Sequence, residues 1–346
     1  MKLFAFFTLL LAMLLAGCSQ GNAQEAPPAP AAAVQAGMPA TTLTQSVDTA
    51  APPSAPVESP APGAQLTPPG TAPLPTQAGP GASPSKTVSS PPASSPTPLA
   101  PGAWKQMPVI PASISPEMVK VFLHGLELGN NPRAFSKVGD CGSTPAWFLG
   151  DFDRGPRFYN LGDHADLEAV IQEFQGSYSR TSLAARAGFN TSAVFTPLWA
   201  DRKSCTSGET PLACEYRIQR PAFSFITLGT NDIWHPDAFE PQMRKIIEFS
   251  LENGVIPILS TKADQAGKDD QINEKLAQLA AEYRLPLWNF WLAAQALPDG
   301  GLQEDGSHLT WGPNRFNDPQ VMQKAWPVRN LTALQVLDAV WRGVRK

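Results

Sequence analysis

The prolines and the tryptophans of this 346-residue chain occupy different parts of it. Of the 37 prolines, 20 precede Trp104, whereas all nine tryptophans lie from Trp104 onward. A segment rich in Pro, Ala, Ser and Thr, with few charged or aromatic residues, cannot bury enough apolar surface to offset its ordering entropy. We therefore expect residues 18–103 to be a disordered tether and residues 104–346 to form one folded domain.

Residues 1–17 have the features of an export signal. Lys2 supplies a positive charge, and the apolar run 3–15 is too short to span a bilayer. The run ends in Leu15-Ala16-Gly17-Cys18, which resembles a bacterial lipobox. That resemblance implies cleavage before Cys18 and attachment of a lipid to it. The protein would then be exported and held at the extracytoplasmic face of the cell envelope by the lipid alone. An ordinary secretory signal is the alternative, and the tether that follows favours the lipoprotein.

Charge and histidine spacing narrow the classes of partner. The formal net charge is −4, which gives no support for a nucleic-acid partner or for an anionic membrane partner. No cluster of His and Cys has the spacing of metal ligands. We therefore expect no metal and no cofactor, and we expect a monomer.

Strand-like and helix-like patterns alternate along residues 104–346. The patterns predict strands at 134–138, 222–228, 255–260 and 285–290, and helices at 115–129, 166–174, 182–187, 241–252, 270–283 and 331–344. Ser115 is the expected N-cap of the first helix, and Pro257 suggests a bulge or a strand end. Such alternation favours βαβ units and a three-layer α/β/α fold with a mainly parallel sheet.

Three short motifs follow the predicted strands. Gly139-Asp140-Cys141 comes after the first strand, Gly229-Thr230-Asn231-Asp232 after the second, and Asp305-Gly306-Ser307-His308 after the last. Each motif alone is a common turn composition. In this order they resemble the GDSL/SGNH hydrolase family over most of residues 134–310, with one departure: Cys141 stands where that family has a serine. In parallel sheets, sites form at the carboxyl ends of strands, so we expect the three motifs in one cleft.

The resemblance implies a role for each motif in acyl transfer. Cys141 would be the nucleophile, His308 the general base, and Asp305 the carboxylate that orients the base. The oxyanion would bind the side-chain amide of Asn231 and the backbone N–H groups of Cys141 and Gly188.

Further residues are candidates for the oxyanion site and for substrate binding in this cleft. Gly162 is a weaker candidate than Gly188 for the oxyanion donor. Asp140, Trp234 and Trp311 are assigned to substrate binding, although packing is the more common role of a tryptophan.

A cysteine at the nucleophile position changes the chemistry. A thiolate is a strong nucleophile, but it is also a good leaving group, so an intermediate formed from an oxyester can collapse back to substrate. Three interpretations of Cys141 stay open: a thiol hydrolase or transferase, a binding protein on a hydrolase scaffold, or a disulfide. Ser143 lies two residues further on and should face elsewhere, which argues against it as a substitute nucleophile.

Cys205 and Cys214 flank a polar loop. In an oxidising compartment a bridge between them would close a small ring and contribute roughly 2.5–3 kcal/mol by the chain-entropy estimate. The prediction is a Cys205–Cys214 disulfide with Cys141 outside it.

The leading functional hypothesis is an ester hydrolase of the cell envelope. Short acyl esters, such as O-acetyl groups on glycans, are the substrates that the resemblance and the location suggest. The alternative is a catalytically inactive ligand-binding protein on the SGNH scaffold. A purely structural envelope protein is a third class, and it predicts no functional cleft.

Overall fold

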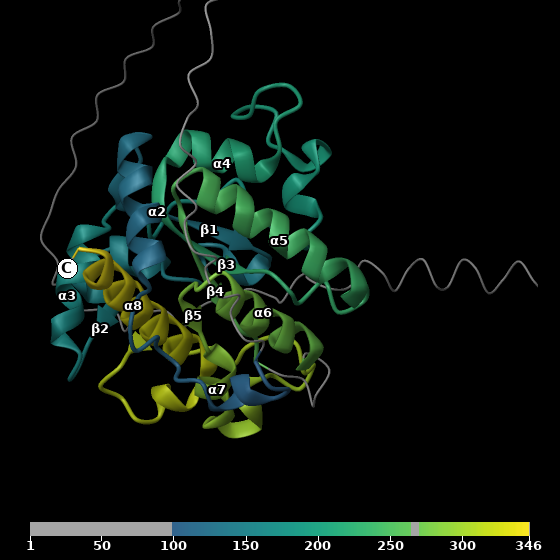
Figure 1. The fold of residues 1–346 in the computed structure, drawn as a ribbon. Helices are drawn as coiled ribbons and strands as arrows, with labels where there is room; N and C mark the ends of the chain where they lie inside the picture. Colours follow the sequence, from purple (N-terminus) through teal and green to yellow (C-terminus); the bar gives the residue numbers. More distant parts are fainter. Residues whose placement is uncertain (1–98, 264–269, 346) are drawn as a thin grey trace, which may run out of the picture. The chain divides into compact units, whose positions relative to one another are not determined.

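The computed structural model describes residues 99–263 and 270–345 (Figure 1). The predicted export signal, the predicted lipid-attachment residue Cys18 and the predicted tether up to residue 98 lie outside the described residues. Within the described ranges, no helix has the length and apolar character needed to cross a membrane.

A four-stranded sheet forms the centre of the fold, and every neighbouring pair of its strands is parallel. Its strands, in spatial order, are β1 (Asn131–Gly139), β3 (Pro221–Thr227), β4 (Ile256–Ser260) and β5 (Leu287–Trp288). A separate two-stranded parallel pair joins β2 (Tyr159–Asn160) to β6 (Asn314–Arg315). The predicted parallel α/β fold is therefore confirmed, although β5 is much shorter than the pattern at 285–290 predicted.

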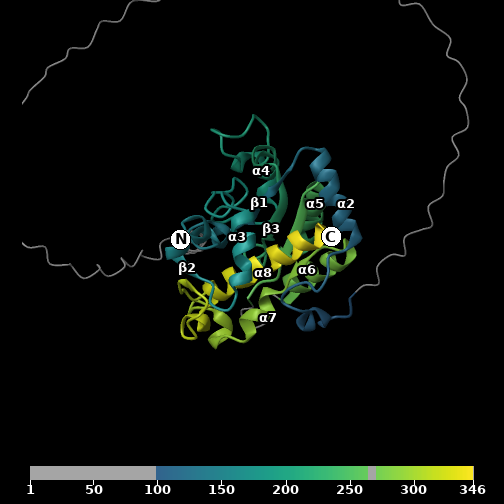
Figure 2. The same ribbon diagram turned by 90° about the vertical axis from the view of Figure 1, so that its left-hand side faces the viewer.

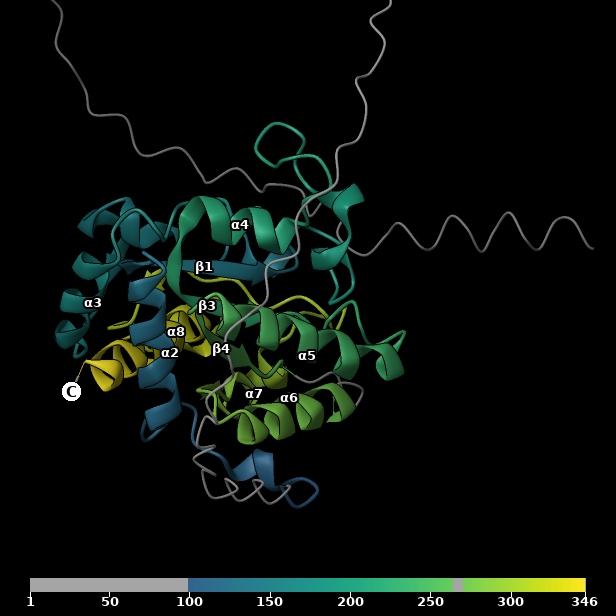
Figure 3. The same ribbon diagram turned by 45° about the horizontal axis from the view of Figure 1, so that its top comes forward.

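Helices cover both faces of the sheet, as Figures 2 and 3 show. Because the strands follow one another in one direction and crossovers are right-handed, the three helices that connect them share a face. These are α4 (Pro211–Gln219), α5 (Pro236–Glu252) and α6 (Asp270–Glu282). The opposite face carries α2 (Pro116–Glu127), α3 (Glu168–Glu173) and α8 (Ala325–Val344), and α7 (Phe290–Gln295) follows β5.

Successive residues of the central strands point to opposite faces of the sheet, so alternate residues contact the two layers of helices. Phe223 of β3 stacks on Phe122 of α2, with 5.8 Å between ring centroids, and also contacts Phe174. On the other side of β1, the hydroxyl of Ser136 donates to the buried carboxylate of Glu215 on α4 at 2.6 Å. A strand that is covered on both faces is buried at successive residues, as β1 is from Ala134 onward and β3 is throughout.

The helix ends follow proline and cap signals. Ser115 caps α2 as predicted, since its hydroxyl accepts from the Met118 N–H at 3.4 Å and Pro116 follows it. Two helices begin earlier than predicted: α5 at Pro236 and α8 at Ala325. Pro236 is the first residue of α5, and Pro327 lies in the first turn of α8. A proline in the first turn costs the helix no hydrogen bond.

The helix predicted at 182–187 is absent. Ala185 instead pairs with Gly139 at the outer edge of β1. The Gly139 N–H donates to the Ala184 carbonyl, and the Arg186 N–H donates to the Gly139 carbonyl, each at 3.1 Å. The apolar residues of this segment are buried because the segment covers the sheet edge, and burial of that kind resembles a helical pattern in a short window.

Pro257 lies inside β4 without interrupting it. The Leu259 N–H donates to Pro286 on the β5 side, so residue 257, two positions earlier, faces the same side. There β5 has not yet begun to pair, because β4 meets it only at Leu259 and Ser260. The missing N–H therefore costs the sheet no hydrogen bond.

Candidate active site

The carboxyl ends of the central strands open into one cavity of about 550 Å³. Cys141 reaches it from the end of β1, Asn231 from the end of β3 and Lys262 from the end of β4. His308 reaches it from the loop between α7 and α8. The structure thus brings together the three predicted motifs, which are separated by up to 170 residues in the chain.

Cys141 begins a short 3₁₀ turn directly after β1 and is partly exposed. Asp140 caps this turn, because its Oδ1 accepts from the Gly142 N–H at 2.9 Å. Gly139 lies against the hydroxyls of Ser143 and Thr227, which leave no room for a side chain. The turn is therefore fixed by close packing beneath it.

Ser143 is fully buried and hydrogen-bonded to Thr227. It does not line the cavity. The expectation that Ser143 faces away from the site is confirmed, so among Cys141 and Ser143 only the cysteine presents a nucleophile to the cavity.

A buried arginine supports the same turn from α8. Arg329 is 6% exposed, and its Nη1 donates to the Gly142 carbonyl at 2.6 Å. The guanidinium lies 4.7 Å from the ring centre of Phe148 and 5.0 Å from that of Trp326. Burial lowers the pKa of Arg329 to about 10, against the attraction of Asp140 and Cys141, which raises it. A guanidinium is thus held beside the turn of Cys141 and is charged at neutral pH.

Lys262 is a second cation that lines the cavity. It lies with Arg329 and Asp140 at the base of the cavity, which we call the floor. The Lys262 ammonium donates to the Thr227 carbonyl at 3.1 Å and lies 3.8 Å from Asp140 Oδ2. It is largely buried, as is Asp140. Lys262 forms an ion pair with Asp140, and Arg329 is attracted by both Asp140 and Cys141, so the floor of the cavity carries two cations and one carboxylate.

Asp305 and His308 form the predicted pair. His308 Nδ1 lies 2.6 Å from Asp305 Oδ2, and Oδ1 accepts from the backbone N–H groups of Ser307 and His308, each at 2.9 Å. Burial raises the pKa of Asp305, but these hydrogen bonds outweigh it and lower the pKa to about 2. With Nδ1 engaged, Nε2 is the ring nitrogen left for proton transfer.

Asn231 is held at the end of β3 by its neighbours. Its Nδ2 donates to the Phe189 carbonyl at 2.8 Å. Next to it, Asp232 accepts from the N–H of Thr191 at 3.0 Å and from its hydroxyl at 2.6 Å. Burial raises the pKa of Asp232 although these bonds oppose it. An amide nitrogen carries two protons, so Asn231 retains one donor for a ligand.

The two glycines considered for the oxyanion site lie differently. Gly188 adjoins Phe189, the partner of Asn231, and has a φ of 81°, but it does not line the cavity. Gly162 donates its N–H to Asn160 Oδ1 at 3.0 Å and packs against Asn317. Gly162 is therefore not available as an oxyanion donor, while Gly188 stays a prediction.

The predicted substrate-binding residues fall at two places. Asp140 lies on the floor of the cavity, and Trp234 lines it with 78% of its surface exposed. Trp311 does not line this cavity. It lies at a second, smaller one of about 230 Å³. The two tryptophans therefore do not share one cavity.

Cys205 and Cys214 form the predicted disulfide, with 5.4 Å between their Cα atoms. Cys141 is not part of it. In the described part of the chain, one group of metal-ligand side chains lies close together, Cys205, Glu209 and Cys214. Its two sulfurs are joined to each other, so it lacks the thiolates that would hold a metal.

Sequence reasoning missed both cations of the floor. Lys262 follows β4, so the rule that located Cys141 and Asn231 at strand ends would have found it. Arg329 carries a different signal: a charged residue on the apolar face of the closing helix, one turn from Trp326 and Ala333. A charge in that position needs a buried partner. The partner here is the turn at residues 139–143, which we call the nucleophile turn because it contains the predicted nucleophile Cys141.

No protein-family model and no curated protein matches the sequence. Among solved structures, a lipase/acylhydrolase from Enterococcus faecalis aligns with 18% identity and a TM-score of 0.38, over 61% of this chain and 96% of that one. A GDSL-like lipase from Bacteroides thetaiotaomicron aligns with 12% identity and a TM-score of 0.35, over 64% of this chain and 98% of that one. At such values these likenesses support no inference about activity, so function is argued from the residues of the site.

Proposed function

We propose that the protein is an SGNH-type esterase with a cysteine nucleophile. The observation that supports this most is that Cys141 and His308 line one cavity while Asp305 fixes the imidazole through Nδ1 at 2.6 Å. Nucleophile, base and orienting carboxylate are the groups that acyl transfer requires.

In the proposed reaction His308 takes the proton of the Cys141 thiol, and the sulfur attacks the acyl carbonyl to form a tetrahedral intermediate on the way to a thioester. The oxyanion of the intermediate is stabilised by Asn231 and by the backbone N–H groups of Cys141 and Gly188. The C–O bond then breaks, and protonated His308 gives its proton to the departing alcohol. Water, deprotonated by His308, adds to the thioester, and the carboxylic acid leaves as the thiol is restored.

The two cations at the base of the cavity, Lys262 and Arg329, bear on the attack by the Cys141 sulfur and not on the collapse of the intermediate back to substrate. A positive charge close to Cys141 stabilises the negative charge that develops on the sulfur as it loses its proton. The same charges attract an anionic alcohol or acyl component, which bears on substrate choice.

We assign the activity to short acyl esters on glycans, such as O-acetyl groups, outside the cytoplasm. The lipobox-like sequence at Cys18 and the Pro-rich tether support export and attachment to a membrane surface through the lipid only. With the tether predicted for residues 18–103, the folded domain would reach polymers some tens of ångströms from the membrane, roughly 50 Å for a coil of this length.

The test is hydrolysis of p-nitrophenyl acetate by the purified full chain. Wild type, Cys141→Ala and Cys141→Ser are compared at equal folded concentration. We expect turnover by wild type and none above background by Cys141→Ala. If only the serine variant turned over, the scaffold would be competent but the natural cysteine would not be an esterase nucleophile. The ligand-binding alternative would then replace this proposal.

A further inference from the structure

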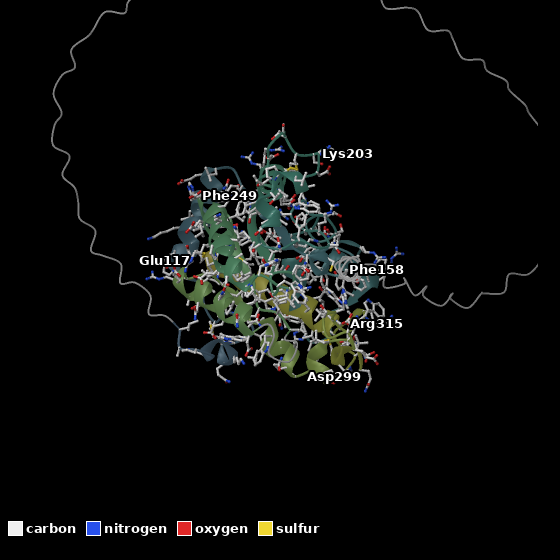
Figure 4. All side chains as sticks on the ribbon, turned by 90° about the vertical axis from the view of Figure 1, so that its right-hand side faces the viewer. Glu117, Phe158, Lys203, Phe249, Asp299 and Arg315 are labelled. Carbon is white, nitrogen blue, oxygen red and sulfur yellow. A yellow bond between two sulfur atoms is a disulfide. The ribbon has the colours of Figure 1, made fainter. Side chains whose placement is uncertain are left out.

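The second cavity carries features that the proposed reaction does not use. Its walls come from two distant stretches, Ala146–Phe158 and Trp311–Arg315, together with Trp326 and Asn330 of α8. The β2–β6 pair holds these stretches side by side. Figure 4 shows Phe158 and Arg315 near one another on one side of the molecule.

The base of this cavity is a buried polar network. Asn314 donates from Nδ2 to Asp151 Oδ2 at 3.0 Å, and Asn330 donates from Nδ2 to Asn314 Oδ1 at 3.0 Å. Asn314 and Asn330 are both buried. Because these amides satisfy one another, the base is fixed before any ligand arrives.

The rim of the cavity has an excess of positive charge. Arg154 is neutralised by Asp151, whose Oδ1 lies 2.8 Å from its Nη1. Arg157 and Arg315 are exposed, and neither forms an ion pair with another described residue. Two guanidinium groups are therefore available to a carboxylate, and their planar donor sets match it well.

Exposed tryptophans line the same cavity as those cations. Trp147 stacks on Trp326 with 5.6 Å between ring centroids and is 45% exposed, and Trp311 is 63% exposed. An indole presents a flat apolar face on which the C–H face of a sugar ring can stack. The pairing of exposed indoles with guanidinium groups suits a sugar that carries a carboxylate.

Trp326 also borders the first cavity, so the two cavities are neighbours. A methyl group added to Gly142, the residue after Cys141, would lie 3.6 Å from the indole of Trp326. One side of this ring therefore borders the nucleophile turn, and the ring also stacks on Trp147 of the second cavity. A linear ligand with one residue in each cavity would pass over Trp326.

We propose that the second cavity is a subsite for an acidic sugar of the glycan whose ester enters the first cavity. The inference rests on the proposed function and narrows its substrate class to acidic polysaccharides. A volume of about 230 Å³ is below the range of roughly 300–1,000 Å³ that holds a whole small ligand, which favours a single sugar residue of a longer chain.

The experiment measures binding and needs no turnover. The full chain with Cys141→Ala is titrated with a galacturonate tetrasaccharide and with neutral cellotetraose by calorimetry at low salt. We expect the acidic sugar to bind at least about tenfold more tightly and to weaken as salt is raised. The paired variant Arg157→Met/Arg315→Met should lose at least about fivefold in affinity for it, and Trp311→Ala should weaken it too.

The control is Arg202→Met, an exposed arginine shortly before the disulfide loop, which should bind like the parent. Equal binding of both sugars, no binding of either, or no change in the paired variant would overturn the proposal. Tighter binding of a thymidine oligonucleotide that depended on Arg157 and Arg315 would overturn it as well. Acidic-sugar binding by a chain without esterase activity would leave the subsite standing and remove only the proposed function.

Discussion

The nucleophile turn and the Asp305–His308 loop supply the two halves of the proposed reaction, but they are held in different ways. Gly139 and Asp140 are buried, and Arg329 donates to the turn from the far end of the chain. Asp305 and His308 are each about half exposed. The hydrogen bonds of their loop are mostly formed within residues 301–310. The sulfur is thus positioned by side chains packed in the core, whereas the base is positioned mainly by hydrogen bonds within its own loop.

The largest expected effect comes from the loop. His308→Ala should lower kcat for p-nitrophenyl acetate about 10³-fold, since it removes the general base. The free energy of unfolding should change by less than about 0.5 kcal/mol, because the side chain is half exposed. His124→Ala, at an exposed position on α2, is the matched control and should keep the rate. A His308→Ala enzyme with the wild-type rate would place the base elsewhere.

For the nucleophile turn we expect the opposite pattern, in which a substitution mainly lowers the free energy of unfolding. Gly139→Ala would drive a methyl group into Ser143 and Thr227, and we expect it to lower the free energy of unfolding by about 2–3 kcal/mol. Gly176→Ala has the same change in an open place with a φ of 88°, so only backbone strain of about 1 kcal/mol applies. Denaturant unfolding of the full chain measures both. Equal losses in the two variants would mean that the turn is less tightly packed than the structure indicates.

The smallest effect is a pH dependence of the loop. The pKa of Asp305 is about 2 in the fold and 3.8 ordinarily, so the unfolded chain binds more protons and stability rises with pH. The contribution is complete above about pH 4 and is lost as the pH falls toward 2. Exposure screens it, and we expect less than about 1 kcal/mol.

The stability difference between wild type and Asp305→Asn, followed by denaturant unfolding between about pH 5 and pH 2, measures this contribution. It should shrink as the pH falls. A difference that stayed constant across this range would show that the charge of Asp305 contributes nothing to the loop.

Much of the fold was predictable because its signals are local. The cap at Ser115, the periodicity of α6 and the buried runs of β3 and β4 each depend on a few neighbouring residues. The segment at 182–187 was misassigned because its burial comes from the edge of β1, which no local pattern encodes. Tertiary pairing determines such segments.

The same distinction applies to the site. Cys141, Asn231 and His308 were predicted to share a cleft from strand ends and motif order, and they line one cavity. Arg329 could not be connected to Cys141 in that way, since the contact joins α8 to a turn 187 residues earlier. Trp311 was misplaced for a related reason. It lies three residues after His308, but sequence proximity does not specify on which side of Trp326 a side chain falls.

The long connection between β1 and β3 has a consequence for how such a protein can change. Residues 144–220, which follow the turn of Cys141, contribute no strand to the central sheet, and their α-helices, α3 and α4, are short. They nevertheless carry the disulfide, the partner of Asn231 and one wall of the second cavity. Surface loops in this connection could be lengthened or exchanged at little cost to the sheet that positions the nucleophile. One wall of the second cavity is thereby separate from the turn of Cys141, so that wall could change without rebuilding the turn.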